Sequence, residues 1–307
     1  MIVSHSEKVK PVVRSPKVAT LLETITGEQL REWVEHISVP RHFSAEPAQN
    51  RATADWLAGV FGSMGYRVER QGKFSNIVAL PDCALEKAIL VGAHYDSVPM
   101  CPGADDNGSA VAAMLGCVAA CSLWRPVLPI VFVAFNREED GLLGSIDFVE
   151  SYLPRAPFKV RCAHILEMVG FASSEPGSQR LPTGLPVKVS DTGDFLGLLA
   201  NGSSTAAMNL VLRHAGTYVS GLPVTGLNVK LGLEKYFPVL GRSDHAPFWQ
   251  EKIPAVMWTD TSEFRNDNYH RHTDTPETLN YPFLKQVTQL LTACVIQQAQ
   301  HDLNNEH

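Results

Sequence analysis

The chain lacks several kinds of segment that would assign it to a large class of proteins at once. Its 307 residues contain no run approaching the roughly 20 apolar residues of a membrane-spanning helix. The start of the chain, MIVSHSEK, lacks the apolar centre of a secretion signal. No stretch is rich in lysine and arginine, as phosphate-backbone binding would require, and the net charge is −6. We therefore expect a cytoplasmic protein that binds neither membranes nor nucleic acids.

Cysteine is scarce, and two common catalytic motifs are missing. The six cysteines show neither zinc-finger spacing nor the density of a disulfide framework. The sequence contains no G-x-S-x-G nucleophile elbow and no H-E-x-x-H helix. These absences argue against a serine hydrolase and against a zinc peptidase of the H-E-x-x-H type, so a hydrolytic site would have to be assembled from strand-end residues.

What the sequence does contain is an alternation of strand and helix patterns. Hydrophobic residues make up 45% of the chain, which is ample for a large core. Such alternation predicts an α/β fold in three α/β/α layers around a central mixed, mostly parallel sheet. The expected strands are 66–70, 76–80, 88–93, 128–135, 162–167 and 253–258, and the expected helices are 26–38, 48–64, 109–115, 141–152 and 282–298.

The patterns also predict how the chain is organised. Residues 1–25 are weakly periodic and contain two prolines, which indicates an N-terminal arm. Residues 26–307 are expected to form a single domain. Within it, residues 173–241 are rich in glycine and serine and weakly patterned, which predicts a lid-like insertion of loops and short elements over the site.

Acidic and imidazole side chains gather at the ends of the predicted strands and in the loops beside them. Each cluster alone has an ordinary structural explanation, such as a buried histidine, a solvated pair of glutamates or a helix cap. Together they form a carboxylate and imidazole mixture without thiolate, which suits catalytic zinc, and two ions would need a bridging carboxylate such as Asp105. The clusters are His94-Tyr95-Asp96, Asp105-Asp106, Glu138-Glu139, Glu167, Ser243-Asp244-His245 and His270 to Asp274.

These motifs occur along the chain in the order HxD, GADD, EE, a strand-end acid, SDH and H-x-x-x-D. In this order the chain resembles the co-catalytic zinc aminopeptidases of the bacterial leucyl aminopeptidase type. This family is related to glutamate carboxypeptidase and glutaminyl cyclase. The resemblance implies a zinc exopeptidase fold, two zinc ions and a peptide or small amide as substrate. It also implies roles for individual residues: His94, Asp105, Glu139, Glu167 and His270 as metal ligands, with Asp105 bridging, Asp96 orienting His94, and Glu138 as general base.

Three further residues, Asp106, Asp244 and His245, are expected near the metal ligands without binding metal themselves. Asp106 is expected to shape the turn without binding metal. Asp244 and His245 are expected beside the site, where His245 would contact substrate or support a ligand. His270 is preferred over His272 as the last ligand, because it stands four residues before Asp274, the spacing of the resembling enzymes.

Glu167 departs from the family pattern, which usually has aspartate at this strand end. The extra methylene would alter the spacing of the metals or the pocket that receives the free α-amine. Three functions are therefore weighed: an aminopeptidase with two zinc ions, a single-zinc glutaminyl cyclase or other amide hydrolase such as a carboxypeptidase, and a non-catalytic binding module. The sequence leaves open the substrate side chain and the oligomeric state.

Overall fold

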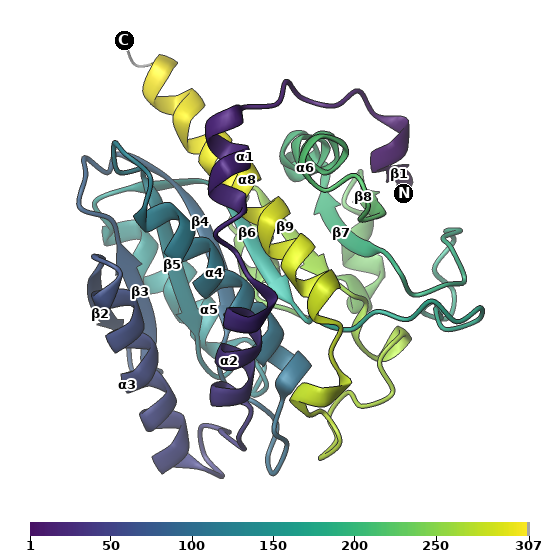
Figure 1. Cartoon of the computed structure of the whole chain (residues 1–307). Coiled ribbons are helices and arrows are strands. Elements are labelled where there is room, and N and C mark those ends of the chain that lie inside the picture. The colour runs from purple at the N-terminus through teal and green to yellow at the C-terminus, as the bar shows by residue number, and fades with distance from the viewer. Residues whose placement is uncertain (306–307) are drawn as a thin grey trace.

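The computed structural model describes residues 1–305, with side chains described for residues 1–300. This part of the chain forms one nine-stranded sheet in the order β1-β8-β7-β9-β6-β4-β5-β3-β2, with helices on both faces (Figure 1). The predicted three-layer α/β fold is confirmed. The strands are β1 (Ile2–His5), β2 (Arg67–Gln71), β3 (Asn76–Leu80), β4 (Lys87–His94), β5 (Ile130–Phe135), β6 (Lys159–Glu167), β7 (Leu196–Asn201), β8 (Val224–Val229) and β9 (Ala255–Thr259).

The helices contribute mainly to two hydrophobic cores, one on each face of the sheet, and a third cluster of three buried residues contains Leu199. The larger core contains side chains of α1, α2, α3, α4, α6 and α8, and the smaller one contains Phe148 and Phe248, which follow or belong to the short helices α5 and α7. The bounds are α1 (Pro16–Leu22), α2 (Gly27–Ile37), α3 (Pro47–Ser63), α4 (Ala110–Ser122), α5 (Leu143–Asp147), α6 (Thr205–Tyr218), α7 (His245–Gln250) and α8 (Tyr281–Asn305).

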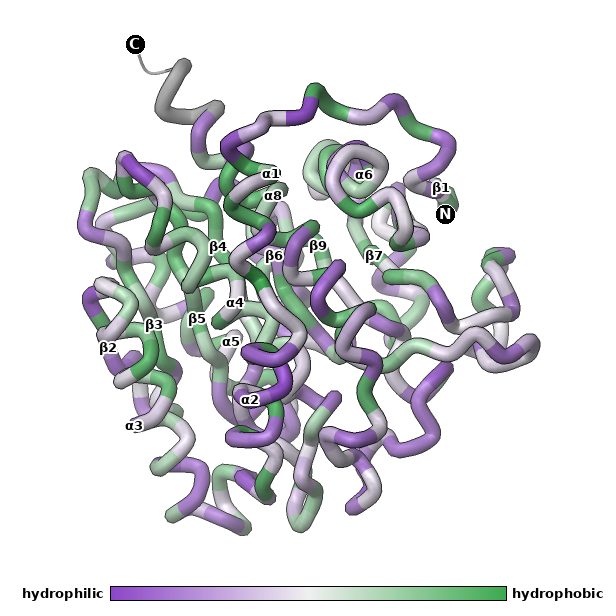
Figure 2. The backbone as a smooth tube through the Cα atoms, viewed as in Figure 1, coloured by the Kyte–Doolittle hydropathy of each residue, from purple (hydrophilic) through white to green (hydrophobic). Residues whose placement is uncertain are grey.

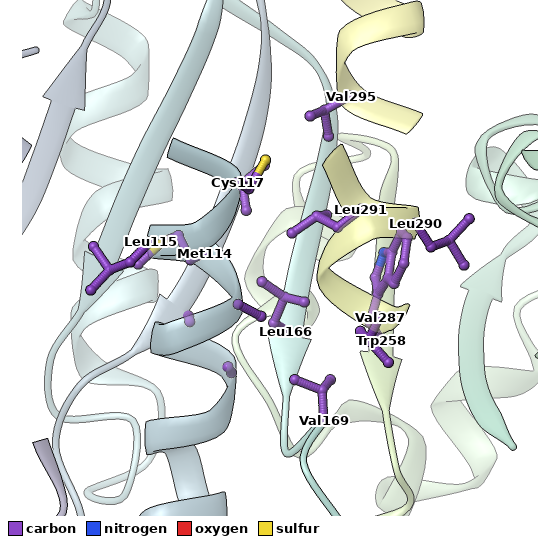
Figure 3. Close-up of a cluster of buried hydrophobic side chains, with 14 of the residues drawn as sticks. Met114, Leu115, Cys117, Leu166, Val169, Trp258, Val287, Leu290, Leu291 and Val295 are labelled. Atoms are coloured by element: carbon purple, nitrogen blue, oxygen red, sulfur yellow. The ribbon is translucent and has the colours of Figure 1, made fainter. Parts of the chain in front are cut away.

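The centre of the sheet is apolar because helices cover both of its faces. Every residue of β3 and β5 is buried, and hydrophobic colour runs along the central strands in Figure 2. On the larger core's face, α4 and α8 pack over β6 and β9, where Leu166 and Trp258 lie against helix residues such as Leu291 (Figure 3). This packing fixes the strand positions, and so it also fixes where their ends lie.

The four central strands, β9, β6, β4 and β5, run parallel to one another. Their carboxyl ends therefore meet at one edge of the sheet, which is where open α/β sheets bind ligands. β4 ends at His94, β6 ends at Glu167, and β5 leads into the segment with Glu138 and Glu139. The fold thus brings together side chains that are widely separated in the sequence.

Two predictions about organisation differ from the structure. Within the expected arm, β1 pairs antiparallel with β8 and α1 buries Val18, Leu21 and Leu22. Within 173–241, residues 196–229 form β7, α6 and β8 instead of a lid of short elements. Two strands of this interval belong to the main sheet, and the irregular segments on either side of them line the cavity described below. None of the described helices is long and apolar enough to cross a membrane.

Candidate active site

His94 is held at the end of β4 by a carboxylate two residues further along the chain. The distance from His94 Nδ1 to Asp96 Oδ1 is 3.5 Å, and both residues are buried. The Asp96 carboxylate also accepts hydrogen bonds from the backbone N–H groups of Glu138 (3.2 Å) and Glu139 (3.3 Å). One carboxylate therefore fixes the histidine relative to both glutamates, an arrangement suited to the orienting role expected for Asp96.

The loop after β4 places Asp106 between two histidines. Asp106 Oδ1 lies 3.5 Å from His94 Nε2, and Asp106 Oδ2 lies 3.2 Å from His270 Nε2. This position was predicted for Asp105, so the prediction is corrected by one residue. The physical reason is the backbone at Asp106 (φ −101°, ψ 89°), which departs from the helical conformation and turns its side chain away from that of Asp105.

Asp105 instead holds the loops behind the site. Its fully buried carboxylate accepts hydrogen bonds from Gly170 N (3.0 Å) and Asn266 Nδ2 (2.7 Å). It thereby ties the turn before Asp106 to the segment after β6 and to the segment that leads to His270. Neither oxygen of Asp105 faces the two histidines, and Asp106 does more than shape the turn.

Two groups of possible metal ligands result. Within each group the donor atoms lie within 4.8 Å of one another: His94, Glu138 and Glu167 in one, and Asp106, Glu139 and His270 in the other. His94 Nε2 is 3.4 Å from Glu167 Oε2, and His270 Nε2 is 3.3 Å from Glu139 Oε2. Because Asp106 reaches both histidines, the two groups are continuous.

Of the two candidate histidines, His270 lies among the other possible ligands. The Nε2 atom of His270 faces Asp106 and Glu139, and its ring stacks on Tyr269 at a centroid distance of 3.8 Å. His272 is exposed and belongs to neither group. The structure therefore favours the chosen histidine over its alternative.

Asp274 does not pair with His270, as their spacing would suggest. Its carboxylate accepts hydrogen bonds from the backbone N–H groups of Asp105 (2.9 Å) and Asp106 (3.1 Å). The loop of His270 thus anchors the loop of Asp106. This anchoring role could not be predicted from the sequence, because a contact with main-chain N–H groups has no sequence signal.

Glu167 is fixed by the hydroxyl of Ser243, which donates a 2.6 Å hydrogen bond to Glu167 Oε2. Glu167 is buried at the end of β6, and its longer side chain still reaches His94. Ser243 belongs to the Ser-Asp-His motif, and it is the member of that motif that lines the cavity.

The other two members of the motif do not line the cavity. His245 is buried, donates a hydrogen bond from Nε2 to Leu240 O (2.9 Å), and packs edge-on against Trp249. The substrate contact expected for His245 is therefore not supported. Asp244 is fully buried beside the site, where burial raises its pKa to about 7, the charge of His94 lowers it and that of Glu167 raises it.

The pKa shifts of the buried acids and of His94 indicate a site suited to bind cations. Burial raises the pKa of Glu138 well above its usual range, and the nearby Glu167 carboxylate raises it further. Burial lowers the pKa of His94, but the Glu167 and Glu138 carboxylates and Asp96 outweigh this effect and raise it. Without a cation, these acids and imidazoles can neutralise one another only by holding protons.

The donor atoms fit a divalent metal. His94 Nε2 and Glu139 Oε1 are buried and have no hydrogen-bond partner among the described residues. Buried polar atoms are normally satisfied, so these point to a missing partner. The set contains imidazole and carboxylate groups without thiolate, as expected of catalytic zinc.

A cavity of about 530 Å³ opens beside these residues. One side of the cavity, its floor, is formed by the sheet where β1, β8, β7 and β9 lie next to one another. A row of neighbouring residues on these four strands lines it: Val3, Leu227, Leu199 and Met257. The next row contains Thr225, Gly197 and Thr259, so the missing side chain of Gly197 deepens the floor. Residues 180–189 supply further apolar side chains, among them Leu181, Leu185 and Val187.

The chain is similar in sequence to known proteins. The YfbL protein of Escherichia coli K12 is 32% identical over 94% of this chain and 91% of its own length. The aminopeptidase YwaD of Bacillus subtilis 168 is 31% identical over 67% of this chain, but this match covers 40% of YwaD.

Solved structures support the fold. The LapA aminopeptidase of Legionella pneumophila has a TM-score of 0.75 at 20% identity, covering 95% of this chain and 76% of its own. Glutaminyl cyclase of Porphyromonas gingivalis has a TM-score of 0.67 at 18% identity, covering 89% of this chain and 99% of its own. The family model described as Peptidase family M28 matches residues 76–295. The chain therefore belongs to peptidase family M28, and the expectation of an enzyme is confirmed.

Proposed function

We propose that this enzyme is an aminopeptidase that removes apolar N-terminal residues from peptides with the help of two divalent metal ions, zinc in the first place. One observation carries the proposal. The two ligand groups are joined by Asp106, and their carboxylates line a cavity whose other walls are largely apolar. Metal ligands beside a largely apolar cavity suit the cleavage of a bond next to an apolar terminal side chain.

In this proposal His94 and Glu167 would hold one ion, Glu139 and His270 would hold the other, and Asp106, which lies between the two histidines, would be shared by both. When bound, two such ions activate water and polarise the peptide carbonyl. Glu138 is the general base: its carboxylate accepts a proton from the attacking water and passes it to the departing amine nitrogen. Asp96 fixes the histidine and, through the backbone N–H groups of Glu138 and Glu139, the start of the acidic segment.

The charges around the cavity favour a substrate's amino end over its carboxyl end. Asp106, Glu138, Glu139 and Glu167 all line the cavity. Its two arginines are already engaged by acids, since Arg180 pairs with Asp267 and Arg242 pairs with Glu263. With two divalent ions bound, these four carboxylates balance the charge of the ions. Because both lining arginines are paired as well, the cavity offers no free basic side chain to bind the carboxyl end of a substrate. This supports an aminopeptidase over a carboxypeptidase.

A single-zinc glutaminyl cyclase is the main alternative, and a mass-spectrometric assay separates it from the proposal. The purified enzyme is incubated with peptides that begin with leucine, phenylalanine, alanine or glutamine, each in free and N-acetylated form. We expect loss of the terminal residue from free peptides only, abolished by a chelator and restored by zinc. Loss of ammonia from the glutamine peptide without cleavage would indicate the cyclase. Cleavage at the carboxyl end, or no chelator-sensitive turnover, would contradict the proposal.

Filling the cavity should change the side-chain preference. Leu199 lies in the middle of the apolar row on the floor, so Leu199→Trp removes space for a large substrate side chain. We expect kcat/KM for leucyl and phenylalanyl substrates to fall by about 10- to 100-fold, with little change for alanyl substrates. The matched control is Leu231→Trp at an exposed position. An equal loss for all three substrates would contradict this use of the cavity.

The two candidate histidines can be compared directly. His270→Ala removes the imidazole beside Asp106 and Glu139, and we expect activity to fall by at least about 100-fold because an ion loses a ligand. His272→Ala alters an exposed side chain and should leave turnover nearly unchanged. Initial rates at saturating zinc provide the measurement, and a greater loss in His272→Ala would reverse the assignment.

A further inference from the structure

Arg41 is a fully buried arginine in the connection between α2 and α3, outside every motif considered above. Burying a guanidinium group is costly unless its N–H groups are paired. Its environment therefore indicates what the residue does.

The guanidinium group of Arg41 donates only to main-chain carbonyls. Nε donates to Tyr95 O (2.6 Å), one terminal nitrogen donates to Val39 O (3.2 Å) and to Pro102 O, and the other donates to Gly103 O (2.9 Å). Tyr95 stands between His94 and Asp96, and Gly103 begins the turn that leads to Asp106. One side chain thus connects the end of β4 to the loop of the bridging aspartate.

The main chain of Arg41 reaches a third part of the site. Its N–H group donates to Ser97 Oγ (3.1 Å), and its carbonyl accepts from Asn50 Nδ2 (2.8 Å). The side-chain amides of Asn50 and Asn136 are hydrogen-bonded to each other at 3.0 Å. Asn136 lies two residues before Glu138. Arg41 is therefore linked to three segments of the site: the end of β4 with His94, the loop with Asp106, and, through Asn50 and Asn136, the segment with Glu138.

The Gly103 turn packs closely against its neighbours. Gly103 has a left-handed backbone (φ 60°), and a Cβ atom there would lie 2.2 Å from Asp106 O and 3.2 Å from a terminal nitrogen of Arg41. The arginine is therefore packed against the turn as well as hydrogen-bonded to it. Its positive charge also partly offsets the carboxylates of Asp96, Asp106 and Asp274, which raise its pKa while burial lowers it.

We propose that Arg41 is a positioning residue that sets the spacing between His94 and Asp106, and thereby the geometry of the two-ion site. The inference rests on the proposed function. Lysine would keep the charge but lose the planar fork that reaches several carbonyls at once. Partners that orient metal ligands typically change metal affinity by about 10- to 100-fold when they are replaced.

The test measures metal binding and needs no peptidase assay. Zinc affinity is determined by competition with a chelating dye, and the visible spectrum of the cobalt form reports ligand geometry. For Arg41→Lys we expect zinc affinity to fall by about 10- to 100-fold, with an altered cobalt spectrum. The control is Leu57→Ala in the buried face of α3, which should lower thermal stability while leaving affinity within about threefold and the cobalt spectrum unchanged.

A second variant covers the case in which Arg41→Lys does not fold. Ser97→Ala removes the acceptor for the Arg41 N–H group and the donor to Cys101 O, both within the same loop system. We expect about a 5- to 50-fold loss of affinity for this variant. Affinities no lower than that of Leu57→Ala would overturn the inference. If the wild-type protein binds no divalent metal, both the proposed function and the positioning role of Arg41 are contradicted. If wild type and variants bind zinc equally well, only the positioning role is contradicted.

Discussion

Glu138→Gln is expected to lower kcat by about 10²- to 10⁴-fold, because an amide cannot accept the proton of the attacking water. The substitution keeps the size and shape of the side chain, so the neighbouring His94 and Glu167 should remain in place. Metal affinity should stay within about tenfold of wild type, since the proposed ligands are unchanged. Steady-state kinetics with a leucyl amide, together with zinc titration, provides the measurement.

The adjacent glutamate gives the matched control. Glu139→Gln alters a residue whose Oε2 atom lies 3.3 Å from His270 Nε2, and it should weaken zinc binding as well as catalysis. The two variants thus separate the base from the ligand. A Glu138→Gln enzyme that retains more than a tenth of wild-type kcat would show that another group removes the proton.

Asp106→Asn should have a comparably large effect, but through loss of metal. Its two carboxylate oxygens lie 3.5 Å from His94 Nε2 and 3.2 Å from His270 Nε2, so the amide removes the negative charge from the bridging position. We expect zinc affinity and activity each to fall by about 100-fold or more. Dye competition for zinc and initial rates at saturating zinc measure the two effects.

Asp105→Asn is the informative comparison, because the sequence motif alone points to that residue. Its carboxylate accepts from Gly170 N and Asn266 Nδ2, and one new amide donor there would face an existing donor. We expect the metal-free variant to lose about 1–3 kcal/mol in the free energy of unfolding, measured by denaturant titration. In a separate zinc titration, the variant should still bind zinc. The opposite result, loss of zinc in Asp105→Asn and retention in Asp106→Asn, would restore the bridge to Asp105.

The difference between these two aspartates illustrates what the sequence could and could not predict. An apolar run followed by His94 and Asp96 is a local signal, and so are paired glutamates after a strand. Because the ends of parallel strands meet, the sequence could predict that these side chains converge. It could not predict which of two adjacent acids faces the site, because this depends on the non-helical backbone at Asp106.

The elements missed in the sequence have a common physical cause. β1 is four residues long and gains its hydrogen bonds from β8, more than 200 residues away. Such short strands are stabilised by their neighbours and leave a weak pattern of their own. The role of Arg41 could not be predicted for a related reason. Its partners are main-chain carbonyls, which every residue has, so its contacts leave no pattern in the sequence.

The number of metal ions bound per chain tests the two-ion site most directly. The metal-free protein is titrated with zinc by calorimetry and the endpoint is checked by elemental analysis, while activity is followed in parallel. The continuous arrangement of two ligand groups across Asp106 predicts two zinc ions per wild-type chain, with full activity only when both sites are filled. Full activity with one ion per chain, or no specific binding at all, would contradict this account.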